Sequence, residues 1–228
     1  MSDYTNDATA VELTEVTKKY GYLQALKSVS LRIKCGEFVA FSGHNGAGKT
    51  TLLKIIATHI SPSSGSLRIF GEDALKSETR RELRRRIGLV THLSFLYDEL
   101  SVRENLLFYA RLFGAREEDF LGTAEFLGLQ RWYNTPVKQL SHGLRKRAEI
   151  VRALIHDPDL ILLDEPFSGL DTKTCDLLVS YFRSRAGKTL LISSHSLEWS
   201  EKICERRISL EKGRVVGENQ FYSFKTSL

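Results

Sequence analysis

The sequence has no hydrophobic run long enough to cross a lipid bilayer, although 42% of its 228 residues are hydrophobic. A transmembrane helix needs roughly 18 consecutive apolar residues. The first ten residues, MSDYTNDATA, also lack the basic and apolar regions of a secretory signal peptide. We therefore expect a cytoplasmic chain, and any work at a membrane would require a partner that spans it.

Cysteine is scarce, and internal repeats and low-complexity tracts are missing. The chain has three cysteines, Cys35, Cys175 and Cys204, an odd number without close spacing. This pattern argues against a disulfide scaffold or a metal knuckle and suits a reducing cytoplasm. The length and ordinary composition predict one domain of two lobes with a sizeable core.

A large excess of charge of one sign is also missing, since the net charge is +5. The densest basic cluster, RRELRRR at residues 80–86, contains a glutamate and an apolar position at helical spacing, and no aromatic residues are interleaved with it. We interpret it as a solvated helix face, with proximity to anionic lipid headgroups as an alternative. Nucleic acid is not expected as a partner.

What the sequence does contain is GHNGAGKT at residues 43–50, a match to G-x-x-x-x-G-K-[ST]. The glycines let backbone N–H groups turn toward phosphates, Lys49 supplies a mobile charge, and the Thr50 hydroxyl is suited to Mg²⁺. A predicted buried strand at 37–42 precedes the loop and a predicted helix at 50–60 follows it, so a helix N-terminus faces the anion. An unrelated glycine-rich turn would not explain this context. The residues expected to contact the nucleotide here are Gly43, His44, Asn45, Gly46, Ala47, Gly48, Lys49, Thr50 and Thr51.

Two further apolar strands end in groups suited to phosphate chemistry. LILLDE, residues 160–165, predicts a central strand whose Asp164 holds Mg²⁺ and whose Glu165 accepts the proton of the attacking water. Such strands also begin ordinary turns, but the phosphate loop favours the catalytic interpretation. TLLIS at 189–193 leads to His195, which would orient water or stabilise developing charge, although a histidine at a strand end is often structural.

A second helix N-terminus is predicted at LSHGLRKR, residues 140–147. Ser141 is a good N-cap, and Gly143 permits close approach of a ligand to the backbone. This terminus suits a phosphate, yet it cannot easily serve the same nucleotide from the same side as the first loop.

With these motifs, the chain resembles the nucleotide-binding subunits of ATP-binding cassette (ABC) transporters over residues 11–211. In that family the signature LSGGQ binds the γ-phosphate of ATP held by the partner subunit. Here His142 stands in place of one of the two glycines and Leu144 in place of the glutamine, whereas Ser141 and Gly143 are kept. The resemblance implies an α/β fold with a P-loop NTPase (RecA-like) core, an antiparallel β subdomain and a helical subdomain.

The same resemblance implies ATP and Mg²⁺ as ligands and assigns three further residues. Tyr20 matches the aromatic residue that stacks on adenine, and Tyr22 is the nearby alternative. The alternative structural interpretation is an aromatic residue on a β-strand that has no contact with the nucleotide. Asp171, in SGLD, matches the loop that crosses the dimer interface, and it is also a good helix cap. His92 stands where the family has a glutamine, and we expect it to contact water or γ-phosphate rather than Mg²⁺.

The expected subdivision assigns 11–35 and 67–72 to the antiparallel part, 37–60 and 155–211 to the core, and 93–152 to the helical part. Ser101 and Glu104 form a predicted capping box that opens a helix. The first ten residues and a tail at 213–228 are expected to be loosely held.

The family resemblance implies a mechanism of ATP-driven, head-to-tail dimerisation. The motion would pass to integral membrane permease subunits near residues 92–99, on the cytoplasmic face of the membrane. His92, SFLYDELSVRENLLFYARLFG and IIATHISPSSGSLRIFG are similar to the ATP-binding subunit of the haem exporter of cytochrome c maturation. The alternatives are an ABC ATPase of another exporter, a soluble or regulatory ABC protein, and a simple phosphate-loop kinase, which would leave LSHGL and SGLD unexplained.

Overall fold

The computed structural model describes residues 8–185, 187–195 and 198–221. Its core is a six-stranded sheet in the order β10-β9-β3-β8-β7-β6, in which only the β10–β9 pairing is antiparallel among the described strands. These strands are β3 (Phe38–Ser42), β6 (Ile87–Val90), β7 (Leu160–Asp164), β8 (Thr189–Ser194), β9 (Arg206–Glu211) and β10 (Arg214–Gln220). The strands β6, β7 and β8 are buried throughout because both faces of the sheet are covered.

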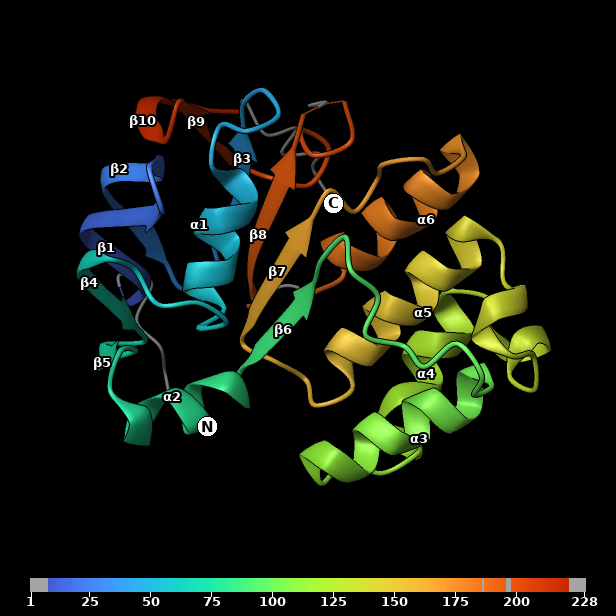
Figure 1. Ribbon diagram of the computed structural model, residues 1–228. Coiled ribbons are helices and arrows are strands. Elements are labelled where there is room, and N and C mark those ends of the chain that lie inside the picture. Colours follow the sequence, from blue (N-terminus) through green and yellow to red (C-terminus); the bar gives the residue numbers. More distant parts are fainter. Residues whose placement is uncertain (1–7, 186, 196–197, 222–228) are drawn as a thin grey trace.

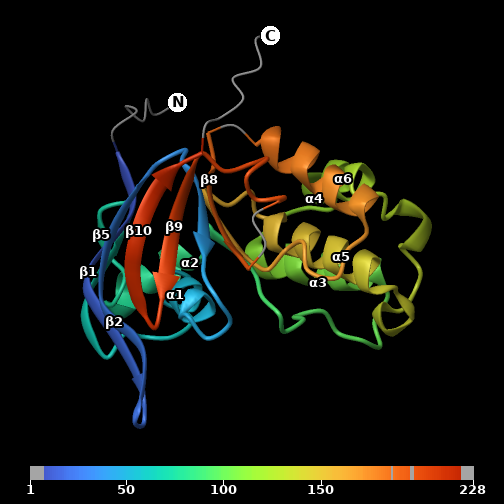
Figure 2. The same cartoon turned by 90° about the horizontal axis from the view of Figure 1, so that it is seen from above.

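A second sheet of four antiparallel strands has the order β2-β1-β4-β5. Its strands are β1 (Thr9–Tyr20), β2 (Leu23–Lys34), β4 (Ser64–Ile69) and β5 (Glu72–Asp73). Helix α1 (Lys49–Ile56) lies between the two sheets, as Figures 1 and 2 show. Its residues Leu52 and Ile56 share one buried cluster with Leu13 of β1 and Leu162 of β7. The phosphate loop that precedes α1 is therefore held by both sheets.

Four helices form a helical lobe beside β6 and β7 (Figures 1 and 2), and this lobe shares one buried hydrophobic cluster with the core sheet. They are α3 (Val102–Phe113), α4 (Glu118–Phe126), α5 (His142–Leu154) and α6 (Thr172–Arg183), with short 3₁₀ turns at Gln130–Trp132 and Val137–Gln139. The capping box of Ser101 and Glu104 at the start of α3 is confirmed. Among the described residues, no helix has both the length and the apolar character required to span a bilayer.

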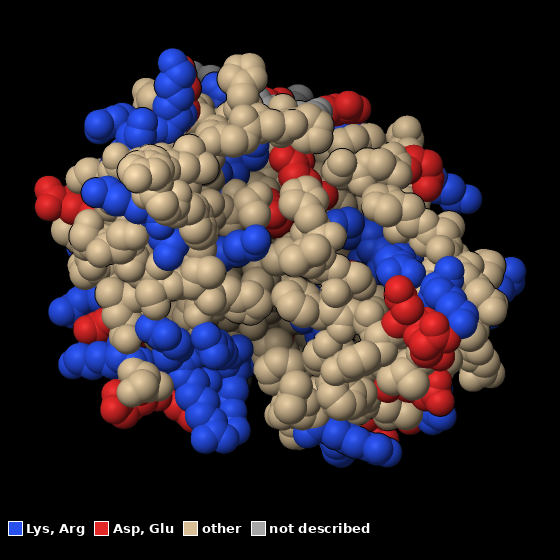
Figure 3. Space-filling view, in the orientation of Figure 1, with Lys and Arg blue, Asp and Glu red and all other residues tan. Residues whose placement is uncertain are grey.

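The basic cluster at 80–86 overlaps α2 (Ser77–Arg84) and behaves as a solvated helix face. Leu83 is buried, whereas Arg81 and Arg85 are exposed. Lys and Arg side chains gather over the region of α2 in Figure 3. Arg86, just after the helix, pairs with Asp159 at 2.7 Å.

The prediction of a loosely held tail from residue 213 is wrong for the strand β10. This strand pairs with β9, and Glu218 accepts a hydrogen bond from Arg206 at 2.7 Å. Edge pairing requires few buried apolar residues, so the polar composition concealed the strand. Thr9 and Ala10, also expected to be loose, belong to β1. The remaining parts of these two predictions, residues 1–7 and 222–228, lie outside the described residues.

Gly88 of β6 gives a test of core packing. A Cβ atom added there would lie 2.5 Å from the Ala153 carbonyl oxygen and 2.8 Å from Cγ of Pro158. We expect Gly88→Ala to lower the free energy of unfolding by about 1 to 3 kcal/mol, because a packed core resists added volume. Gly122 of α4 has open space at its Cβ position, so Gly122→Ala should instead stabilise by roughly 0.5 to 1 kcal/mol. Urea unfolding of both variants checks this, and equal effects would contradict it.

Candidate active site

The phosphate loop leaves β3 and enters α1 through glycines that no other residue can replace without strain. Gly43 has φ of 147°, and a Cβ there would lie 2.3 Å from the Leu210 carbonyl oxygen. Gly48 has φ of 108°, and its Cβ would lie 2.8 Å from the Ala25 carbonyl oxygen. Lys49 is buried, and its ammonium donates to the Gly43 carbonyl at 2.6 Å. The loop thus curls around the lysine, as a phosphate cradle requires.

Asp164 lies at the end of β7, opposite the first turn of α1. Its Oδ1 accepts hydrogen bonds from Thr50 Oγ1 at 3.1 Å and from Ser193 Oγ at 2.5 Å. Its Oδ2 is buried and has no hydrogen-bond partner among the described residues, with Nε2 of His92 at 3.4 Å. A buried anionic oxygen without a donor, beside a threonine hydroxyl, fits a divalent cation.

The donor set favours Mg²⁺ over a fully protein-ligated metal. Among the described residues there is no group of three His, Cys, Asp or Glu side chains that could hold a metal ion. Mg²⁺ is typically held by one or two protein oxygens together with water and substrate phosphates. Thr50 and Asp164 would supply the protein oxygens, and the bound ion would offset phosphate charge.

Glu165 follows at a sharp bend of the backbone. Its φ of 49° is unusual for a residue with a side chain. The bend is held because its N–H donates to both the backbone oxygen and the hydroxyl of Ser193, each at 3.1 Å. The carboxylate then lies 2.8 Å from Nδ1 of His195 and 3.9 Å from Nζ of Lys49. A carboxylate that an unusual backbone conformation holds between a histidine and a lysine is a good candidate for a general base.

The phosphate loop from Asn45 to Thr51 lines a cavity of about 740 Å³, a size that accommodates a small-molecule ligand. His92, Glu165 and His195 lie on its wall together with the phosphate loop. Tyr20 stands at its edge and is partly exposed, with Nζ of Lys18 at 5.1 Å from the ring centroid. Tyr22, the alternative aromatic, is fully exposed and is not among the described residues that line the cavity.

The signature segment, residues 140–144, lies elsewhere: none of Ser141, His142 and Gly143 is among the described residues that line this cavity. The predicted N-cap is confirmed, because Ser141 Oγ accepts from the Leu144 N–H at 3.3 Å. The His142 ring packs against Gly169, where a Cβ would lie 3.2 Å from Cε1 of the imidazole. The signature segment therefore lies outside the cavity that this chain's own phosphate loop lines.

Asp171 caps α6, as one of its two interpretations predicted. Its carboxylate accepts from the Thr174 N–H at 2.9 Å and from the Thr174 hydroxyl at 2.8 Å. These hydrogen bonds hold the pKa of Asp171 below its usual value. Contact of Asp171 with a nucleotide stays a prediction.

Comparison with known proteins identifies the family. The model of the ABC transporter family matches residues 26–168. The chain belongs to the ABC transporter family. It is 36% identical over 217 residues to the ABC transporter ATP-binding protein NatA of Bacillus subtilis, an alignment that covers 90% of this chain and 87% of NatA. It is 34% identical to the bacitracin transport ATP-binding protein BcrA of Bacillus licheniformis, covering 96% of this chain and 72% of that protein.

Solved ABC cassettes share the fold. A dimeric bacterial ABC transporter cassette superposes with a TM-score of 0.85 at 32% identity, covering 94% of this chain and all 100% of that one. The same cassette as a post-hydrolysis dimer with ADP and phosphate gives a TM-score of 0.82, again at 32% identity and with the same coverage. The predicted P-loop NTPase fold is confirmed, and the chain is an ABC-type ATPase.

Sequence reasoning missed several residues of this ABC ATPase site. Ser193 joins Asp164 to the backbone of Glu165, and Lys27 and Lys212 line the cavity near Tyr20. The signal for Ser193 was a hydroxyl at the carboxyl end of a buried parallel strand, next to the strand that ends in Asp164. The lysines gave no local signal because they lie on other elements.

Ser193 provides a test of how the carboxylates are held. Ser193→Ala removes the hydroxyl that donates to Asp164 and accepts from Glu165. We expect the Mg²⁺ concentration for half-maximal turnover to rise about tenfold, since groups that orient metal ligands commonly contribute this much. Ser209, whose hydroxyl contacts Ser42 at 3.1 Å in the same sheet, gives the matched control Ser209→Ala. An unchanged Mg²⁺ dependence in Ser193→Ala would contradict the assignment.

Proposed function

We propose that this ABC ATPase powers export through separate membrane subunits by closing as a head-to-tail dimer on two ATP molecules. The observation that carries the proposal is the separation of the two phosphate-binding motifs. Lys49, Thr50 and Glu165 line one cavity, whereas Ser141 and Gly143 are not among the described residues that line it. A nucleotide in the cavity would be contacted on one side only, and a second copy would supply the missing side.

Each ATP is held by Lys49, Thr50 and Asp164 of one copy and by Ser141 and Gly143 of the other. Glu165 takes the proton of the attacking water, and His195, 2.8 Å from that carboxylate, orients the water or stabilises the charge that develops at the γ-phosphate. His92 orients water or γ-phosphate beside Asp164. Tyr20 stacks on the adenine, and Asp171 lies in the segment that crosses between the copies. Hydrolysis then separates the two copies.

Membrane subunits are the second partner in this proposal, and the chain works peripherally on the cytoplasmic face of the membrane. A groove of about 270 Å³ between the helical lobe and the core, lined by Phe95, Tyr109 and His156 among others, supports such contact. Similarity to BcrA and to the Nod factor export ATP-binding protein I of Rhizobium johnstonii, 38% identical over 92% of this chain and 69% of that protein, supports export. The names of these two relatives give no support to haem as the exported molecule. Haem export stays the narrower prediction, which rests on His92 and its flanking segments.

Glu165→Gln separates closure from hydrolysis. We expect turnover to fall by roughly a hundredfold to ten-thousandfold, the contribution typical of a general base. ATP binding should persist, so the variant should form a dimer with ATP in light scattering, whereas the wild-type dimer should be short-lived. Lys49→Ala is the control, because it should neither bind ATP nor dimerise. A Glu165→Gln chain that stays monomeric in saturating ATP and Mg²⁺ would refute the proposed dimer.

A further inference from the structure

The loop that leaves β6 carries His92 to the ATP site and then enters the helical lobe. We define this connecting loop as residues 91–98. It starts directly after Val90, which is paired with Leu163 of β7 and is fully buried. His92, two residues on, lies 3.4 Å from the carboxylate of Asp164. The loop thus begins at a fixed point of the core sheet.

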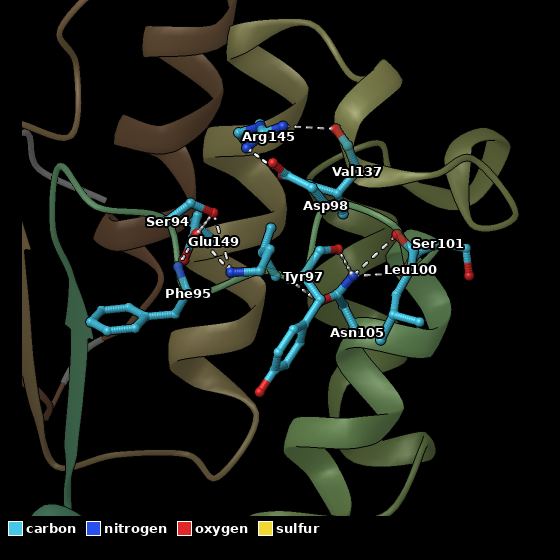
Figure 4. Close-up of polar contacts among 11 residues, drawn as sticks. Ser94, Phe95, Tyr97, Asp98, Leu100, Ser101, Asn105, Val137, Arg145 and Glu149 are labelled. Atoms are coloured by element: carbon cyan, nitrogen blue, oxygen red, sulfur yellow. Dashed lines mark hydrogen bonds and ion pairs between the residues drawn. The ribbon is translucent and has the colours of Figure 1, made fainter.

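Glu149 of α5 fastens the middle of the connecting loop, as Figure 4 shows. Its Oε1 accepts hydrogen bonds from the N–H groups of Phe95 at 2.8 Å and Leu96 at 3.3 Å, and also from the Ser94 hydroxyl. Glu149 is only 4% exposed. Charge-assisted hydrogen bonds of this kind are about twice as strong as neutral ones, so one carboxylate holds three successive residues.

Arg152 compensates the buried charge of Glu149 and ties it to the core. Its guanidinium lies 3.2 Å from the second carboxylate oxygen of Glu149. It also donates to the Leu89 carbonyl of β6 at 2.6 Å. A buried carboxylate is stable only when it is paired and hydrogen-bonded. The fastening of the loop therefore forms one unit with β6, the strand from which the loop starts.

The far end of the connecting loop is held as well (Figure 4). Asn105 of α3 accepts from the Tyr97 N–H at 2.7 Å and donates to the Tyr97 carbonyl at 3.0 Å. Asp98 pairs with Arg145 of α5 at 2.8 Å. From Ser94 onward the connecting loop is therefore held by the helical lobe, and within this loop residues 91–93 make the crossing from the core.

Those three bridging residues have little conformational freedom. They join the end of β6 to Ser94, and an extended residue spans at most about 3.6 Å. The Thr91 hydroxyl donates to the Leu93 carbonyl at 3.0 Å and closes the short turn around His92. The position of the imidazole therefore depends on where Glu149 holds Ser94.

We propose that Glu149 is a positioning residue that keeps His92 at Asp164 and makes its position follow helix α5. The proposal rests on the proposed role of His92 in hydrolysis. The N-terminus of α5 carries Ser141 and Gly143, and Glu149 lies eight positions after Ser141, about 12 Å along the helix axis. When ATP bound by a second copy contacts this N-terminus, it therefore acts on the connecting loop through one rigid element, the helix α5.

Kinetics of two variants and a control test this role. Glu149→Gln keeps the shape but weakens the charge-assisted bonds, and Ser94→Ala removes one hydroxyl from a partly exposed position, which limits the risk of misfolding. We expect both to lower kcat, the first by about tenfold because small misplacements of catalytic groups are costly, with KM for ATP within about twofold. Glu118→Gln, which loses an exposed pair with Arg116, should match the wild type.

The same changes in a His92→Ala background distinguish positioning from a purely structural role. If Glu149 acts through His92, Glu149→Gln should lower kcat no further once the imidazole is gone. An equal loss of kcat in both backgrounds would overturn the proposal, as would a His92→Ala chain with wild-type kcat. Failure of the proposed dimer is a separate result, because it is measured by light scattering of Glu165→Gln.

Discussion

The pairing of β7 with β8 is the interaction on which the active site depends. Its register sets Asp164 opposite Ser193. Ser193 can then donate to the Asp164 carboxylate and accept from the Glu165 N–H. A shift of this register by one residue would turn Ser193 to the other face of the sheet. The backbone ladder of two buried strands thus fixes the relative positions of Asp164 and Glu165, the proposed metal ligand and general base.

The motifs that were predictable from the sequence are those with local physical causes. The phosphate loop, its strand and its helix are contiguous, and the caps at Ser101 and Ser141 need only three or four residues. The family resemblance added the order of the motifs. The sequence could predict that Asp164, Glu165 and His195 end neighbouring strands because parallel strands present their carboxyl ends at one edge.

The features that escaped prediction depend on contacts between distant segments. Ser193 gains its role from a strand 29 residues earlier, and Glu149 gains its role from a loop more than 50 residues earlier. A glutamate on a helix is usually solvated, so nothing in its neighbourhood marked it as a buried acceptor. The strand β10 was missed for a related reason, since its stability comes from pairing with β9 rather than from its own composition.

The electrostatics of the cavity explain why the site favours binding of phosphate together with Mg²⁺. Lys49 donates to the Gly43 and His44 carbonyls, and its nearest carboxylate oxygen, on Glu165, is 3.9 Å away. Its charge is therefore not fully neutralised by the protein. Asp164 keeps a buried oxygen without a hydrogen-bond donor among the described residues. An unpaired charge in a partly buried site is unfavourable, and phosphate with Mg²⁺ would supply both missing partners. Backbone and hydroxyl hydrogen bonds hold Lys49 and Asp164 in place in the folded protein. Ligand binding therefore offsets the unfavourable free energy of their incompletely paired charges.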